Sequence, residues 1–393
     1  LVLALVVLLA AACGPAATPT PTPGPTPTPT PMPVDTMLKE AFRWVPVRYA
    51  SEKVEYAAYQ SAATASGFED FEGIPTILER GYPRFLWGVE PDMSAQRLGD
   101  WLRIETGPFA GDIGVYLEGL FGSRGDFHLF EGGFKSAEVT ASLKALGYKT
   151  ATYDGVDYLY FWDDQEQRSL MSHPLREDGI NVNAVALVGD RLLAAPYIDT
   201  LKSLIDLQHG NGESLLDSKP HRTLAQAFDD ELLGARFVTE AWLSEWYIRR
   251  ASRKPTAQQL MDLYVDGPKD WGELSRYSQA LLGYRVTDGG DEMVTALYYP
   301  DPQAAARDAA ELEKRWKTYL FYESSYFGPD AKPVPLTDSC APFSTEVVRY
   351  EDSSVLIGTC KGVVQQGQEK SKAAGLWQNL LANGDYLFLI PDI

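Results

Sequence analysis

Short turn sequences between runs of β-forming residues are the feature that most restricts the fold of this chain. Asp154-Gly155 divides residues 149–161, and Gly189-Asp190 divides residues 183–195. Two-residue turns of this composition join antiparallel strands directly, because their backbone twist matches that of the flanking strands. A parallel sheet would instead need a crossover of a dozen or more residues between its strands. The sequence therefore predicts antiparallel β-hairpins.

Amphipathic helices are predicted before and after these hairpins. In residues 136–146, Val139, Leu143 and Leu146 fall on one helical face, and a second helix is predicted over residues 198–207. The order hairpin, helix, hairpin, helix recurs downstream. It gives hairpins at 277–299 and 346–360, helices at 302–319 and 371–381, and single strands at the two ends, 44–59 and 386–390. We expect an α+β fold of two related domains, with antiparallel sheets and helices packed on one face.

The chain divides by composition into segments of different character. Residues 1–12 are apolar, residues 13–33 consist mainly of Thr and Pro, and the whole formal net charge of -19 belongs to residues 34–393. This last stretch of about 360 residues exceeds the size at which a single core usually stops growing. The predicted domains are therefore residues 34–235 and residues 236–393.

The first residues have the pattern of an export signal. The apolar run Leu1–Ala12 is too short to cross a bilayer as a helix, and small residues directly precede Cys13. With Gly14 next in the chain, this arrangement resembles the lipobox of bacterial lipoproteins. The resemblance implies that the signal peptide is removed, that Cys13 carries fatty acids such as palmitate, and that the protein is extracytoplasmic and lipid-anchored to the bacterial cell membrane. An ordinary secretory signal that contains a cysteine is the alternative.

Residues 14–33 alternate Thr and Pro and carry no charge. Such a segment cannot bury a core, and its prolines favour an extended polyproline II chain of about 3.1 Å per residue. We expect a tether that separates the folded part from the membrane. Threonines beside prolines are also sites for O-linked sugars.

The acidity of the folded part restricts its partners. A strongly negative domain is repelled by phosphate backbones and by anionic lipid surfaces. The charge therefore argues against nucleic acid as a binding partner. The predicted partners are membrane lipid, through acylated Cys13, and another envelope protein or an extracellular ligand.

Two cysteines remain after Cys13, namely Cys340 and Cys360. An even pair in an oxidising compartment predicts one disulfide. Closing this loop of about 20 residues stabilises the fold by roughly 3 kcal/mol. A reactive nucleophilic thiol is the alternative, but no histidine lies near either cysteine in the sequence.

Residues for acid-base, metal or nucleotide chemistry do not form a recognisable pattern. The histidines lack the spacing of a metal site, and each is expected to be structural: these are His128, His173, His209 and His221. Residues 122–125 lack the glycine spacing of a nucleophile elbow, and no phosphate-binding glycine-rich loop occurs. We predict no catalytic residue, no metal ligand and no cofactor.

Acidic clusters at residues 163–166, 229–231 and 288–292 leave an alternative open. Their oxygens suit Ca²⁺, although none has the spacing of an EF-hand loop, and turns or helix starts explain them equally. A hydrolase would need two carboxylates that meet only in the fold. The sequence selects no such pair.

Tryptophans are the remaining candidates for ligand contact. Trp242 and Trp246 fall at helical spacing with Tyr247 and Arg250. Exposed, they would form a stacking platform for sugars or peptides. Aromatic residues four apart on a helix are more often a core stripe, which is the competing interpretation. Four further tryptophans lie near glycine or proline: Trp44, Trp87, Trp101 and Trp271.

Residues 126–228 contain short motifs that resemble exported bacterial domains of unknown function. The motifs are Gly132-Gly133-Phe134, Tyr153-Asp154-Gly155-Val156, the hairpin Val188-Gly189-Asp190-Arg191-Leu192-Leu193, and Ser214-Leu215-Leu216. These are turn and packing motifs, so the resemblance assigns no catalytic residue.

The sequence favours a non-catalytic binding or scaffold lipoprotein. The alternative is an extracytoplasmic hydrolase with a carboxylate-based site between the two halves. A solute receptor for a transporter is a third class, but such receptors commonly have parallel lobes, and the hairpin signals favour antiparallel sheets.

Overall fold

A computed structural model describes most of the folded part of the chain. The residues it describes are 34–49, 53–58, 61, 115–120, 126–132, 134–163, 182–228, 232–243, 271–321, 334–364, 373, 376–377, 380 and 387–391. Residues 34–393 group into one compact unit. Cys13 and the predicted tether lie outside the described residues.

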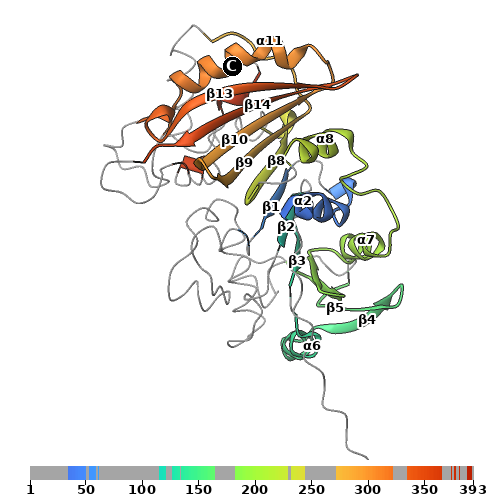
Figure 1. Cartoon of the computed structure of the whole chain (residues 1–393). Coiled ribbons are helices and arrows are strands. Elements are labelled where there is room, and N and C mark those ends of the chain that lie inside the picture. The colour runs from blue at the N-terminus through green and yellow to red at the C-terminus, as the bar shows by residue number, and fades with distance from the viewer. Residues whose placement is uncertain are drawn as a thin grey trace, which may run out of the picture. The chain divides into compact units, whose positions relative to one another are not determined.

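Antiparallel strands form one large sheet across the described part of the chain, in the order β13-β14-β10-β9-β8-β1-β2-β3-β7-β6-β5-β4 (Figure 1). Its strands are β1 (Lys53–Ala57), β2 (Val115–Leu120), β3 (Asp126–Glu131), β4 (Lys149–Tyr153), β5 (Val156–Tyr160), β6 (Ala184–Val188), β7 (Arg191–Ala195), β8 (Gly234–Thr239), β9 (Gln279–Thr287), β10 (Gly290–Tyr299), β13 (Cys340–Arg349) and β14 (Ser354–Gly362). A separate small pair joins β11 (Leu320–Phe321) to β12 (Val334–Pro335). The predicted α+β class with antiparallel pairing is confirmed.

The predicted repeat is visible in the strand order. In the first half, β1, β2 and β3 pair in succession, helix α6 (Ser136–Ala145) comes next, and a later hairpin returns so that β7 pairs with β3. In the second half, β8, β9 and β10 pair in succession, helix α11 (Ala304–Thr318) comes next, and β14 pairs with β10. The first half differs mainly by the additional hairpin of β4 and β5.

The two halves meet through one strand pair in the middle of the sheet. Strands β1 and β8 pair antiparallel, and Glu55 lies opposite Arg236 at the centre of the pair. The predicted boundary between residues 235 and 236 therefore falls inside β8, and the sheet continues across it. No turn signal marks this place, because five of the six residues of β8 are buried.

Helices cover both faces of the sheet rather than one. Helices α2 (Val34–Arg43), α7 (Ile198–Gln208) and α8 (Lys219–Ala227) lie over one face (Figure 1), while α6 and α11 pack on the other. The reason is visible in β7, where Leu193 and Ala195 join the core beneath α7, and Leu192 and Ala194 join the core beneath α6. A strand buried on both faces is apolar at successive positions instead of alternating.

The predicted turn residues adopt the backbone conformations expected of them. Asp154 and Gly155 both have positive φ, 47° and 78°, as a type I′ turn requires. Gly210, with φ of 79°, ends α7 two residues after its last helical residue.

Both single strands predicted at the ends of the folded part differ from the structure. Among the described residues of the range 44–59, Lys53–Ala57 forms the strand, and Val47–Tyr49 forms the 3-10 helix η1. Leu387–Leu389, expected in the last strand, forms the 3-10 helix η7. Side-chain nitrogens of Arg315 donate to carbonyl oxygens of Phe388 and Ile390, at 3.4 and 2.6 Å, so a buried side chain satisfies groups that a strand partner would otherwise bind.

The predicted disulfide is confirmed. Cys340 on β13 and Cys360 on β14 are bonded, with their Cα atoms 5.5 Å apart and neither side chain exposed. The bond joins the two strands at one end of the sheet order.

Candidate functional site

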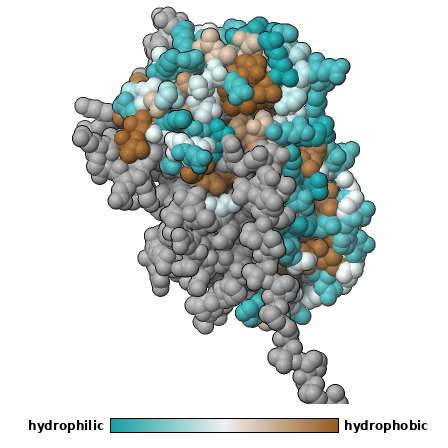
Figure 2. Space-filling model, viewed as in Figure 1, coloured by the Kyte–Doolittle hydropathy of each residue, from teal (hydrophilic) through white to brown (hydrophobic). Residues whose placement is uncertain are grey.

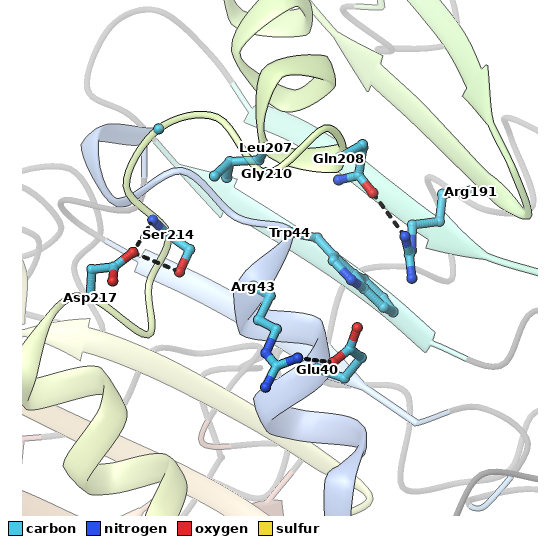
Figure 3. A pocket seen from close by; sticks show the side chains of 10 residues that line it. Glu40, Arg43, Trp44, Arg191, Leu207, Gln208, Gly210, Ser214 and Asp217 are labelled. Atoms are coloured by element: carbon cyan, nitrogen blue, oxygen red, sulfur yellow. Dashed lines mark hydrogen bonds and ion pairs between the residues drawn. The ribbon is translucent and has the colours of Figure 1, made fainter.

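A polar cavity of about 330 Å³ lies where α2 and α7 end (Figure 3). It is lined by Glu40, Arg43, Trp44, Arg191, Leu207, Gln208, Gly210, Gly212, Ser214 and Asp217. All of these residues belong to the predicted first domain. The cavity is therefore not the site between the halves that a hydrolase was expected to have.

Backbone pairing fixes the walls of this cavity. After α2 ends, the amide of Val47 donates to the carbonyl of Glu213 at 3.1 Å, and the amide of Leu215 donates to the carbonyl of Val45 at 2.9 Å. The carboxylate of Asp217 accepts from the amide of Ser214 at 2.8 Å. These bonds hold the loop after α7 against the segment after α2.

Arg191, a charged residue of the cavity lining, contacts three neighbouring side chains. Its guanidinium carbon lies 3.8 Å from the centre of the Trp44 indole, in cation-π contact. Its Nη1 donates to Oε1 of Gln208 at 3.0 Å, and its Nε lies 3.4 Å from Oε2 of Glu131. Figure 3 shows Arg191 beside Trp44, with the hydrogen bond between Arg191 and Gln208 as a dashed line. Side chains from β3, α7 and the segment after α2 thus hold the guanidinium of a β7 residue in place.

The electrostatic surroundings of Arg191 are acidic. The pKa of the Glu131 carboxyl is raised, first by burial and next by the negative charge of Asp190, while Arg191 opposes the shift and Glu40 adds to it. Arg43 forms an ion pair with Glu40 at 3.1 Å, and its own side chain is 64% exposed. Each arginine is thus paired with one carboxylate, Arg191 with Glu131 and Arg43 with Glu40.

A second cavity, of about 260 Å³, adjoins the first and shares Leu207 and Gly212 with it. Arg48 donates to the hydroxyl of Ser203 there. Asp206 accepts from the hydroxyl of Tyr153 at 3.0 Å, which ties the β4–β5 hairpin to α7. The remaining lining residues are Pro46, Val47, Asn211 and Glu213.

The tryptophans predicted for stacking lie elsewhere. Trp242 comes shortly after β8 and packs, half-buried, against the hydrophobic core, and its amide donates to the hydroxyl of Thr239 at 3.1 Å. Trp246 lies outside the described residues. The aromatic wall of the cavity is instead Trp44, only 3% exposed, which the sequence marked merely as a tryptophan near a proline.

Two of the histidines within the described residues make local polar contacts. His209 caps α7, and its Nδ1 lies 2.6 Å from a carboxylate oxygen of Asp154 in the hairpin turn. His221 lies on the first turn of α8, with Nδ1 2.8 Å from the hydroxyl of Ser218. His128 lies on β3. His173 falls outside the described part of the chain.

The acidic clusters form no metal site in the part of the chain that the structure describes, where no three His, Cys, Asp or Glu side chains converge. In residues 288–292, Glu292 accepts from Arg285 at 2.8 Å and lies 4.0 Å from Lys361. Residues 164–166 and 229–231 lie outside the described residues.

Two of the short sequence motifs turn out to supply cavity residues. Arg191 comes from the hairpin motif 188–193 and Ser214 from the motif 214–216. Both were predicted only as turn and packing motifs, and Glu40, Arg43 and Asp217 were not predicted as site residues at all. The sequence signal for this site was the position of Arg191 directly after the two-residue turn Gly189-Asp190.

Comparison with known proteins gives little further information. No protein-family model and no curated protein matches the chain. Among solved structures, crystal forms I, III and IV of TP0453, a Treponema lipoprotein, are similar at 7%, 8% and 8% identity, with TM-scores of 0.35, 0.36 and 0.36. The alignments cover 86–88% of this chain and 96–99% of the TP0453 chains. Scores this low do not establish a common fold, and they say nothing about the function of this chain.

Hydrophilic residues (teal) predominate on the coloured part of the surface in Figure 2, and hydrophobic residues (brown) occur between them. The large hydrophobic side chains that are exposed in the described part are Val286 and Val364. No helix among the described residues has the length and apolar character needed to span a membrane.

Proposed function

We propose that residues 34–393 form an extracytoplasmic binding module, held on a membrane by acylated Cys13 and the Thr/Pro tether, and that the cavity at the ends of α2 and α7 is its ligand site. The ligand is bound without being transformed. The lipobox pattern and the uncharged tether support the location. The cavity supports the binding.

The observation that best supports a binding site is the fixed position of the Arg191 guanidinium. It is held by the Trp44 ring, Glu131 and Gln208 at 3.8, 3.4 and 3.0 Å. A long side chain held this way loses little conformational freedom when a ligand arrives, which favours binding. The cavity volume lies at the lower end of the range for small-molecule sites.

The anchor is tested by metabolic labelling with an alkyne-bearing palmitate analogue. Labelled protein is expected in the membrane fraction, and Cys13→Ser is expected to lose both the label and the membrane association. Cys340→Ala is the control, because that cysteine is bonded to Cys360. Label retained by Cys13→Ser would contradict the anchor.

The binding site is tested on the acylated full-length protein in detergent, with the tryptophan indoles labelled with ¹⁵N. Four probes cover the main ligand classes: cadaverine, glutarate, glucose and N-acetylglycinamide. At least one is expected to shift the Trp44 indole resonance in a saturable way.

A matched pair of variants separates the site from the rest of the surface. Arg191→Met is expected to change the affinity of the probe that binds. Arg307→Met removes an arginine of α11, on the opposite face of the sheet, and is expected to leave the affinity unchanged. Unmoved Trp44 resonance with all four probes would overturn the proposed function.

A further inference from the structure

The carboxylates in and beside the cavity outnumber its two arginines. Glu40 and Asp217 line it, Glu131 lies 3.4 Å from Arg191, and Asp190 directly precedes Arg191 in the chain. Two guanidiniums, those of Arg43 and Arg191, offset these four carboxylates only in part.

Helix ends add to this negative potential. The last residue of α2, Arg43, and the last residue of α7, Gln208, both line the cavity. The C-terminal end of a helix carries about half a negative charge, so both ends favour a cation there. The net charge of -19 also attracts cations from a distance.

The two ion pairs of the site differ in how firmly they are held. Arg191 and Glu131 are 22% and 15% exposed, whereas Arg43 and Glu40 are 64% and 31% exposed. Exposed pairs contribute little and exchange partners readily. Glu40 is therefore the carboxylate that an incoming cation would reach, by competing with Arg43.

We infer that the cavity binds an alkylammonium group, with Glu40 receiving the ammonium and the apolar surfaces of Leu207 and Trp44 contacting its carbon chain. This inference rests on the proposed function, because it names the ligand class of the same cavity. The ammonium could come from a free amine or from a lysine side chain of a partner protein, and the chemistry of recognition is the same for both.

Titrations of the full-length protein with cadaverine, N-acetyl-lysine methylamide and glutarate test the inference, with the Trp44 indole resonance as readout. Both amines are expected to bind and glutarate is not. Binding is expected to weaken as salt is added. The amine that binds with the higher affinity indicates whether the cavity prefers a free amine or a lysine side chain.

Two substitutions with opposite effects make the test specific. Glu40→Gln is expected to weaken cadaverine binding about fivefold. Arg43→Gln removes the competing cation and is expected to strengthen it. Glu138→Gln is the matched control, since this exposed glutamate lies on α6, over the opposite face of the sheet.

The outcomes separate the two proposals. Glutarate binding that weakens in Arg43→Gln, with no amine binding, would overturn the amine inference and leave the binding site in place. Equal cadaverine affinity in Glu40→Gln and Glu138→Gln would also overturn it. Lack of response to cadaverine, glutarate, glucose and N-acetylglycinamide alike would overturn both proposals.

Discussion

Burial controls the titration of single side chains in this molecule. His221 is 6% exposed and lies near the rings of Phe42 and Phe237, whose centroids are 6.0 and 6.3 Å away. Burial among these rings lowers the pKa of the His221 imidazole to about 4, because the charged form loses its hydration. The neutral ring can still accept from the Ser218 hydroxyl through Nδ1.

The lowered pKa of His221 predicts a loss of stability in mild acid. In the unfolded chain the His221 imidazole binds a proton below about pH 6.5. In the folded chain it binds that proton only near pH 4. The free energy of unfolding therefore falls as the pH is lowered through this window, by at most about 3 kcal/mol. Urea unfolding measured from pH 7 to pH 4 checks this.

His221→Asn provides the comparison for that titration. Asparagine keeps an acceptor near the position of Nδ1 and does not titrate, so its stability is expected to fall less steeply between pH 6.5 and 4. Parallel curves for the wild-type protein and the variant would mean that His221 does not contribute to the acid dependence.

Among the elements, the β13–β14 pair depends on its disulfide. Removing the bond by Cys340→Ala with Cys360→Ala is expected to lower the free energy of unfolding by about 3 kcal/mol, because the unfolded chain regains the freedom of the closed loop. Chemical denaturation of the double variant measures the change. A loss below about 1 kcal/mol would show that the bond constrains little.

Elements with local signals were predicted well, and those that depend on distant contacts were not. The hairpins at 149–160 and 184–195 are specified by turns of two residues, and they occur as expected. The segment at 387–389 carries β-forming residues, yet its conformation depends on Arg315, more than seventy residues earlier. Such long-range hydrogen bonds leave no local trace in the sequence.

The cavity shows the same limit. Its residues come from α2, β7, α7 and the loop after α7, so they are brought together only by the backbone pairing of residues 45–47 with 213–215. Trp44 and Arg191 belong to separate segments of the sequence, and no pattern of spacing joins them.

At the scale of the whole molecule, the two halves behave as parts of one structure. Each hydrophobic core contains residues of both halves, for example Val139 with Leu312 on one face and Leu38 with Val355 on the other. We expect calorimetry of the full-length protein to show one cooperative unfolding transition. Two well-separated transitions would mean that the halves unfold independently.

The charged group at the junction of the halves is expected to stabilise this arrangement. Glu55 has no exposed surface, lies 3.1 Å from the ammonium of Lys53 and contacts the guanidinium of Arg236. Glu55→Leu removes the carboxylate that both cations contact, and should lower the free energy of unfolding by about 3 kcal/mol or more.

The double variant Glu55→Leu with Arg236→Leu is expected to lose less than the sum of the single variants, because the pair is removed as a unit. A double-mutant cycle in urea gives this coupling directly. Strict additivity would show that the two side chains do not depend on each other.

A crystal structure of the protein with cadaverine, at a concentration matched to the solution Kd, tests the proposed binding site most directly. Cadaverine is expected in the cavity between Trp44, Leu207 and Ser214, with one nitrogen about 3 Å from the Glu40 carboxylate. An empty cavity, with cadaverine absent or bound elsewhere on the molecule, would contradict the proposed site.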